Sequence, residues 1–324
     1  DGFYEPDAAS TLSSFTGNSD AYKLLSYFGS AEYNYDRRYY LSASIRSDGS
    51  SRFAPKKRWG TFWSVGGSWK ISEESFMKNT KSWLYNLGLR ASYGAQGNDN
   101  VGYYAYQELY SIANNLGESG VIASRLATPN LSWETNLNLN IALDFGLWNN
   151  RLNGSIEVFV RHSKDLLFSL NLVPSSGYTD MDANIGAMRN VGWEFQVSGQ
   201  PIKSRDWEWN VSLNATTYKN TITSLPSDVM WSGDKKWVKG GSLYDWYLIE
   251  WAGVNPKDGN PQWYGIDDKG QKYTTEDYSS LTADDKVKSG SSLPDVTGGI
   301  QSSLNYKNWS FSMFFSYSLG GKIY

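Results

Sequence analysis

The sequence predicts an all-β protein, an antiparallel transmembrane β-barrel to which this chain contributes about twelve strands. Three observations support this fold class. Apolar and polar residues alternate over unusually long segments, tryptophans recur on one face of these segments, and the connections between them tend to be alternately short and long. Alternating strands with short turns at one end and longer loops at the other are typical of membrane-spanning barrels.

The segment 133–147 (WETNLNLNIALDFGL) shows the alternation most clearly. Its odd positions, from Trp133 to Phe145, are mostly apolar, whereas the even positions, from Glu134 to Asp144, are mostly polar. A period of two is that of a β-strand with one apolar and one polar face. The segment is longer than a typical globular strand. About 9–11 residues of tilted strand cross a bilayer, so its length suits a membrane barrel.

The spacing of tryptophans in the segment 59–71 fits the same fold. Trp59 and Trp69 share the apolar face and lie ten residues apart. At about 3.3 Å per residue and a tilt near 40°, they differ in height by roughly 25 Å, which matches the lipid-facing band between two aromatic girdles. The alternative is coincidence, because large aromatic residues favour strands in any β protein.

The other strands are assigned by the same alternation. Residues 1–21 show no period and are predicted to be the end of a loop, and 72–82 (SEESFMKNTKS) are predicted to contain one short helix. The expected strands are 22–33, 38–46, 59–71, 83–96, 133–147, 152–167, 191–199, 207–218, 244–253, 262–266, 296–306 and 309–319. Apart from the two short strands, 220–294 is predicted to be mostly loop.

The connections orient the chain. In outer-membrane barrels the short turns are periplasmic and the longer loops face outward. We therefore expect the turns at Tyr35, Asn149, Ser204 and Lys307 on the periplasmic side. Successive connections alternate between the two sides of the membrane, so the connection 72–82 is expected on the periplasmic side too, although it is not very short. The loops expected to face outward surround Gly49, Gly117, Gly177, Ser232 and Asp284.

Composition excludes several classes of protein. The chain has no cysteine, which excludes a disulfide scaffold, a thiolate metal site and a cysteine nucleophile. Its net charge is −3, so it lacks the basic field that nucleic-acid binding requires. The mean hydropathy of −0.52 argues against a transmembrane helix. A barrel with a wet interior has the same low mean, so hydropathy does not distinguish a soluble protein from a barrel.

No catalytic, metal or cofactor site is predicted, so we expect no enzyme. The only histidine, His162, adjoins Ser163, but neighbouring residues of a strand point to opposite faces and do not form a Ser–His pair. The Asp258-Gly259-Asn260 segment departs from the EF-hand spacing and is interpreted as a solvated turn. The glycine-rich run 97–102 lacks the lysine of a phosphate-binding loop.

Aromatic residues in the expected outward loops are the best candidates for ligand contact. Their flat apolar faces and polar edges suit both sugar rings and peptides. The alternative is that they are girdle or loop-packing residues. The candidates are Tyr103, Tyr104, Tyr106, Trp231, Trp237, Trp246 and Tyr247.

Polar residues on the even face are the second group of candidates. They would line a hydrophilic path, hydrogen-bond a plug or contact a ligand, and we favour the filling of a wet interior over direct substrate contact. The main candidates are Arg90, Asn136 and Asn138. Further residues of this face are Arg46, Lys70, Glu134, Asn140 and Asp144.

Several ordered blocks of sequence carry a family resemblance. They include RSDGSSRFAPKKRWGTFWSVGGSWKISEESF (46–76), LGLRASYGAQGN (87–98), NIGAMRNVGWEF (184–195) and EWAGVNPKDGNPQWY (250–264), together with 130–167. The chain resembles the barrel of SusC/RagA-like TonB-dependent outer-membrane transporters of Bacteroidetes. The resemblance implies that residues 1–324 are the middle to late portion of one barrel domain of about 22 strands. The plug domain and the final strands are expected to lie outside this sequence.

The resemblance also implies a function and partners. It implies a multi-pass outer-membrane protein, in contact with outer-membrane lipid, that imports oligosaccharides or peptides. The implied partners are a SusD-like surface lipoprotein and TonB, the latter reached through a plug segment outside this chain. The alternative is a soluble, secreted, β-rich glycan-binding protein. The two hypotheses differ at the odd positions of 133–145, which face lipid in the first and a dry core in the second.

Overall fold

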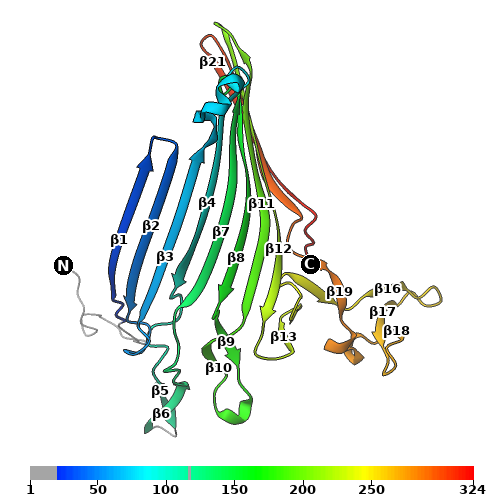
Figure 1. The fold of residues 1–324 in the computed structure, drawn as a ribbon. Helices are drawn as coiled ribbons and strands as arrows, with labels where there is room; N and C mark the ends of the chain where they lie inside the picture. Colours follow the sequence, from blue (N-terminus) through cyan, green and yellow to red (C-terminus); the bar gives the residue numbers. More distant parts are fainter. Residues whose placement is uncertain (1–19, 116–117) are drawn as a thin grey trace, which may run out of the picture.

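The main body of the molecule is a single twisted antiparallel sheet. The computed structural model describes residues 20–115 and 118–324, so most of the predicted N-terminal loop lies outside the described residues. The sheet has ten strands in the order β1-β2-β3-β4-β7-β8-β11-β12-β20-β21 (Figure 1). Their bounds are β1 (Leu24–Tyr35), β2 (Tyr39–Ser50), β3 (Trp59–Lys70), β4 (Leu84–Asn98), β7 (Glu134–Leu147), β8 (Leu152–Lys164), β11 (Ala187–Lys203), β12 (Trp207–Ser224), β20 (Val296–Tyr306) and β21 (Trp309–Leu319).

The sheet confirms the predicted fold class and corrects the strand count. Ten of the expected strands form this sheet, whereas 244–253 and 262–266 belong to small sheets beyond its end. Strands β11 and β12 extend over 17 and 18 residues, well past the predicted bounds. In β11 a register shift between Gly199 and Ile202 breaks the period of two, which is why the pattern ended too early.

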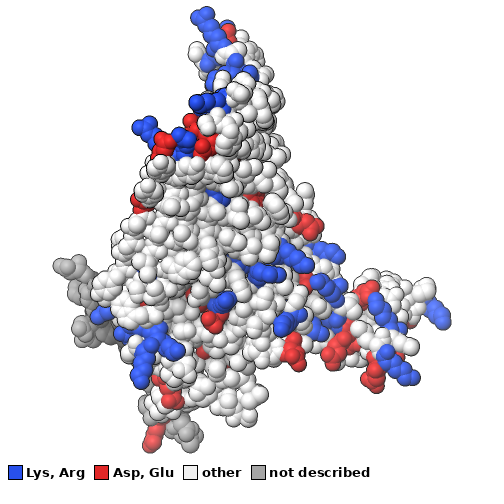
Figure 2. Space-filling view, viewed as in Figure 1, with Lys and Arg blue, Asp and Glu red and all other residues white. Residues whose placement is uncertain are grey.

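The two faces of the sheet differ as the alternation predicts. Leu139 pairs with Val160, and Ile141 pairs with Val158, on the apolar face. Leu139 is 36% exposed and Ile141 is 41% exposed, so neither is enclosed in a dry core. Figure 2 shows a broad band with few charged side chains across the middle of the strands. This arrangement gives no support to the soluble alternative.

Trp133 is an exception to the predicted apolar face. Its ring packs against Phe53 and Phe62, with centroid distances of 5.5 and 5.3 Å, and its Nε1 donates to the carbonyl oxygen of Arg58 at 2.8 Å. Phe53 and Leu131 are almost fully buried beside it. Trp133 therefore belongs to a small core at the loop end, because it precedes the first paired residue of β7.

The short connections lie at one end of the sheet, called here the turn end (Figure 1). Asp36 and Arg37 have φ values of 51° and 56° in the first hairpin turn. The connection 72–82 lies at this end too, as the alternation of sides predicted. It contains two 3₁₀ helices, η2 (Ile71–Glu73) and η3 (Ser75–Thr80), in place of the single helix that we expected.

The opposite end, the loop end, contains small sheets where the sequence predicted mostly loop. The segment 244–253 is not one strand, because Ile249 and Glu250 separate β15 from β16 and the two belong to different sheets. Several of these strands, such as LYSIANN (109–115) and DWYL (245–248), do not alternate strictly between apolar and polar residues, so they lack the pattern that predicts a strand. These sheets are β5 (Leu109–Asn115) with β6 (Glu118–Arg125); β9 (Leu167–Asn171) with β10 (Asp180–Asn184); β13 (Val229–Ser232), β14 (Lys235–Val238), β15 (Asp245–Leu248) and β19 (Val287–Ser291); and β16 (Trp251–Val254), β17 (Pro261–Ile266) and β18 (Lys272–Thr275).

Three further 3₁₀ helices lie in these connections, namely η4 (Pro174–Ser176), η5 (Tyr278–Ser280) and η6 (Ala283–Asp285). No helix in the described part of the chain is long and apolar enough to span a membrane.

Candidate functional site: the polar wall and the loops at its end

The polar face of β4, β7 and β8 carries a charged cluster. Arg90 donates from Nε and Nη2 to the two carboxylate oxygens of Asp144, at 2.6 and 3.0 Å. The Glu157 carboxylate lies 4.0 Å from Arg90 Nη2, and Glu194 of β11 stands opposite Glu157 in the register. The cluster has more carboxylates than cations. It therefore presents a polar, acidic patch to whatever fills the interior.

The two predicted asparagines belong to the same wall. Asn136 donates from Nδ2 to Glu134 Oε1 at 3.1 Å and accepts a hydrogen bond from the Ser163 hydroxyl. Asn138 donates to Gln96 Oε1 at 3.3 Å. Both amides bond within β7 and to one neighbouring strand each, β8 for Asn136 and β4 for Asn138. Internal bonding of this kind favours a structural role in the wall over direct ligand contact. Ser163 faces this wall, whereas His162 is paired with Leu137 on the apolar face, so the two form no catalytic pair.

Small side chains line the neighbouring strands β1 to β4. Ser30, Ser44 and Ser64 are aligned in one row, and the hydroxyl oxygens of Ser44 and Ser64 lie 2.7 Å apart. The row ends at Gly94, where a Cβ would approach the carbonyl oxygen of Trp63 to 2.7 Å. One step nearer the turn end, Ser42, Gly66 and Ser92 form the next row and, with Arg90, line an open groove of about 670 Å³.

Four of the predicted aromatic residues lie in the loop sheet, defined here as β13, β14, β15 and β19, and two of them are in contact. The rings of Trp231 and Tyr247 are edge to face, with centroids 6.1 Å apart. The Lys236 Nζ lies 5.4 Å from the Trp231 centroid and 5.7 Å from that of Tyr247, and Lys286 Nζ lies 5.4 Å from Trp231. Such contacts hold cations over aromatic faces. The pair thus forms an aromatic and basic surface.

The other two tryptophans of the loop sheet are packing residues. Trp237 meets the Phe168 ring edge to face at 5.1 Å and donates from Nε1 to the Leu243 carbonyl oxygen at 3.2 Å. Trp246 donates from Nε1 to the carbonyl oxygen of Lys322 at 3.0 Å. Both indole N–H groups are engaged in internal hydrogen bonds. These contacts favour the packing alternative for both tryptophans, although Lys235 Nζ also lies 4.6 Å from the Trp246 centroid.

The three predicted tyrosines lie elsewhere, in the connection between β4 and β5. Tyr103 contacts the guanidinium of Arg52 at 5.1 Å. The Tyr104 hydroxyl accepts from the backbone N–H of Ala21 at 2.9 Å, and the Tyr106 hydroxyl accepts from Gln107 Nε2 at 2.9 Å. The structure does not bring these three residues into contact with the aromatic residues of the loop sheet within its described part.

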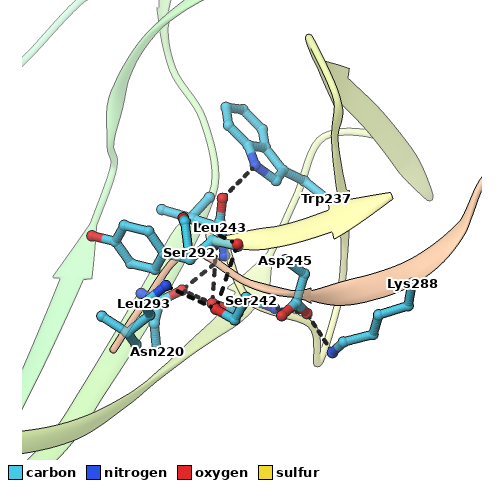
Figure 3. A network of polar contacts seen from close by, with 10 residues as sticks. Asn220, Trp237, Ser242, Leu243, Asp245, Lys288, Ser292 and Leu293 are labelled. Carbon is cyan, nitrogen blue, oxygen red and sulfur yellow. Dashed lines mark hydrogen bonds and ion pairs between the residues drawn. The ribbon is translucent and has the colours of Figure 1, made fainter. Parts of the chain in front are cut away.

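Asn220 joins the loop sheet to the wall, and sequence reasoning missed this role (Figure 3). Its Oδ1 accepts from the Leu243 backbone N–H at 2.9 Å and from the Ser242 hydroxyl at 3.2 Å, while its Nδ2 donates to Asn190 Oδ1 at 2.8 Å. Asn220 is only 3% exposed. Because Asn190 and Asn220 are on the polar face, the loop sheet is attached on the interior side. The one available signal was an even-position asparagine near the end of β12.

Asp245 extends this network within the loop sheet. Its Oδ2 accepts from the backbone N–H of Ser242 at 3.2 Å and from Lys288 Nζ at 2.6 Å (Figure 3). An apolar cluster beneath the network includes Met188 and Ile222 of the wall together with Leu166, Phe168, Trp237 and Leu243. Polar and apolar contacts together fix the loop sheet against the loop end of β11 and β12.

A one-layer sheet with an apolar outer face, a polar inner face and inward-anchored loops at one end defines the wall and mouth of a membrane β-barrel. Comparison with known proteins agrees. The chain belongs to the TonB-dependent receptor β-barrel family, because the family model "TonB dependent receptor-like, beta-barrel" matches residues 1–322.

Two relatives illustrate the similarity. The chain is 33% identical over 324 residues to the TonB-dependent receptor SusC of Bacteroides thetaiotaomicron, covering 93% of this chain and 32% of that protein. It is 29% identical over 332 residues to the TonB-dependent receptor P26 of Formosa agariphila, covering 97% of this chain and 33% of that protein. The chain thus spans about a third of the length of these relatives.

The fold is also similar to a solved structure, that of the RagAB peptide transporter. The two agree with a TM-score of 0.84 and 30% identity, over 98% of this chain and 36% of the other. The predicted SusC/RagA resemblance is therefore confirmed. The chain is part of an outer-membrane β-barrel, and its family is one of transporters rather than enzymes.

Proposed function

We propose that this chain is a section of the barrel of an energy-coupled outer-membrane importer for oligosaccharides or peptides. Residues 1–324 would then be a portion of one barrel domain. The observation that carries the proposal is the polar wall around Arg90 and Asp144, which lies behind an apolar face. Likeness to SusC and to the RagAB peptide transporter supports it. No covalent chemistry is part of this function.

The proposed partners act at the two ends of the barrel. A SusD-like surface lipoprotein would contact the loop end, where the small sheets offer a large outward surface. TonB would act from the turn end, through a plug segment that is not part of these 324 residues. The similarity to SusC and to RagAB supports both partners.

Trp231 and Tyr247 are the proposed substrate contacts among the aromatic candidates. They lie together beside Lys236. Trp237 and Trp246 are assigned to packing because their indole N–H groups are bound internally. Tyr103, Tyr104 and Tyr106, together with Arg90, Asn136 and Asn138, are proposed to shape the path rather than to select the substrate.

The test is uptake by the native bacterium carrying the full-length gene. Deletion is expected to abolish growth on at least one member of a panel of oligosaccharides and peptides, and the wild-type gene should restore it. A Trp231→Ala/Tyr247→Ala double variant should lower uptake of that nutrient by roughly tenfold or more, the usual range for an aromatic hot spot. Surface abundance of the protein, measured by immunoblotting of outer membranes, should stay unchanged.

Phe76→Ala provides the control, because Phe76 is an aromatic residue at the turn end that is 65% exposed. It should leave uptake intact. Unimpaired growth of the deletion strain on the whole panel would contradict the proposed import function. Normal uptake by the double variant would contradict only the assignment of these two residues.

A further inference from the structure

Three basic residues lie together on the outer, apolar face near the loop end. Lys164 ends β8, Arg189 is in β11 and Lys219 is in β12. The register places Lys164 opposite Ala187 and Lys219 opposite Val191, so the two lysines flank Arg189 diagonally on neighbouring strands. Figure 2 shows basic side chains gathered over the loop ends of these strands. We call these three residues the outer basic patch.

The face on which the outer basic patch lies follows from strand alternation. Arg189 pairs with His162, which stands opposite Leu137, so it shares the face of the apolar residues. Val160 and Val191, one step nearer the turn end, are paired on the same face. The acidic cluster around Glu157 lies on the opposite face. A direct ion pair between the outer basic patch and that cluster is therefore excluded by geometry.

The three cations are exposed, and within the described ranges none of their side chains forms an ion pair or a hydrogen bond. The loop sheet differs in this respect, since Lys286 pairs with Asp234 at 2.8 Å and Lys288 pairs with Asp245 at 2.6 Å. An unneutralised cluster of like charges costs folding free energy through repulsion. Its position is thus best explained by an anion from outside the chain.

The outer basic patch begins where the apolar band ends. On β8 the outward positions from Leu152 to Val160 carry no charge, and His162 and Lys164 follow. Leu152 and His162 are ten residue steps apart, which is a rise of roughly 25 Å at about 3.3 Å per residue and a tilt near 40°, the height of the hydrocarbon band. The patch therefore lies at the level of the lipid headgroups in the leaflet that meets the loops.

We propose that the outer basic patch binds the phosphate groups of a phosphorylated lipid in the outer leaflet. The Arg189 guanidinium is suited to bidentate binding of a phosphate, and the flexible lysines on either side supply two further donors. Lys and Arg stems lie along apolar surface while their charged ends reach the headgroups. A lipid is favoured over a soluble anion because the same face continues directly into Val160 and Val191, against which acyl chains pack.

The test uses the full-length transporter in nanodiscs and bis-phosphorylated lipid A as the probe, with bound lipid counted by native mass spectrometry. The Lys164→Gln/Arg189→Gln/Lys219→Gln variant is expected to bind this lipid at least about tenfold more weakly, because each of the three cations adds to the attraction of an anionic lipid surface. The control is Lys56→Gln/Lys57→Gln/Lys239→Gln, which removes the same charge from exposed loop residues. It should bind like the wild type.

Two further measurements test the proposal even if the triple variant does not fold. Wild-type protein should bind bis-phosphorylated lipid A more tightly than a dephosphorylated form with the same acyl chains, a comparison that does not depend on folding of the triple variant. The milder Arg189→Lys variant should retain part of the preference. Equal binding of both lipids by the wild type, equal loss in the control, or equally tight binding of inorganic phosphate at the patch would overturn the proposal. Nutrient uptake is measured separately, so a negative result for lipid binding does not contradict the proposed import function.

Discussion

At the scale of single residues, Glu74 joins three elements at the turn end. Its carboxylate accepts from the Tyr39 hydroxyl, from Trp69 Nε1 at 3.0 Å and from Arg38 Nη1 at 3.1 Å. These hydrogen bonds, with that from Tyr39 contributing most, lower the pKa of Glu74 below its ordinary value of 4.5. One acidic side chain thus connects the first hairpin, the end of β3 and the 3₁₀ segment.

We expect Glu74→Gln to lower the thermal unfolding temperature of the detergent-solubilised full-length protein at pH 7. Because the folded pKa is depressed, the stabilisation by Glu74 is present above its ordinary pKa and is lost as pH falls through the folded value. The difference between variant and wild type should therefore shrink below about pH 4.5. Circular dichroism melting between pH 3 and pH 7 measures this.

Glu73→Gln is the matched control, because Glu73 is half exposed and, among the residues that the structure describes, pairs with Lys81 alone, at 3.3 Å. Exposed pairs of this kind contribute little. A shift in unfolding temperature as large for Glu73→Gln as for Glu74→Gln would contradict the specific role of Glu74.

Gly192 is a second residue whose identity the packing requires. A Cβ at this position would lie 2.4 Å from the Thr217 carbonyl oxygen, 2.5 Å from Tyr218 Cβ and 2.6 Å from Phe159 Cζ. We expect Gly192→Ala to destabilise the barrel by about 1–3 kcal/mol, the usual cost of overpacking. The yield of heat-resistant barrel on semi-native gels should fall. Gly29→Ala, where a Cβ meets nothing within 4 Å, should assemble normally.

At the scale of elements, Asp285 ties the β16–β18 sheet to the loop sheet. Its carboxylate accepts from the backbone N–H groups of Ile266 at 2.8 Å and Thr282 at 2.7 Å, which holds the pKa of Asp285 below its ordinary value. Ile266 ends β17, and Lys286 immediately follows toward β19. We call the β16–β18 sheet the outer arm. The Asp285 hydrogen bonds therefore hold the outer arm to the loop sheet.

We predict that Asp285→Ala loosens the outer arm without unfolding the main sheet. Hydrogen exchange at the Ile266 and Thr282 amides should become at least about fivefold faster, since a lost carboxylate cap costs about 1 kcal/mol. Exchange in β7 should not change. Asp284→Ala is the control, because Asp284 is exposed and its side chain forms no hydrogen bond in the described part of the structure. Equal acceleration by both variants would show that Asp285 does not hold the outer arm.

At the scale of the whole molecule, the sheet separates two environments. Leu139 and Asn138 are neighbours in β7 and face opposite sides of the sheet, Leu139 on the apolar face and Asn138 on the polar face. We expect Leu139→Arg to cost about 2–4 kcal/mol if it lies near the bilayer midplane, and thus to reduce assembly in the outer membrane. Asn138→Arg should be tolerated because the interior is polar. Fractionation and heat-modifiability of the two variants would measure this, and the reverse ranking would mean that the faces are inverted.

Much of the candidate site could be predicted one residue at a time. Alternation placed Arg90, Asn136 and Asn138 on the polar wall, and it separated His162 from Ser163. It did not distinguish Trp231, beside cations, from Trp237, which packs on Phe168. That distinction depends on partners far along the chain, because exposure in a loop depends on tertiary packing rather than on local pattern.

The sequence by itself determined the ten strands of the main sheet, their two faces and the alternation of short and long connections, because these depend on local periodicity and turn geometry. Only the tertiary structure decided that Asn220 binds the 242–243 segment, that Trp133 packs in a loop-end core, and that Lys164, Arg189 and Lys219 meet on one surface. The physical reason is register. Each of these contacts joins residues brought together by the pairing of strands and the folding of long loops, and no local pattern of residues encodes that alignment.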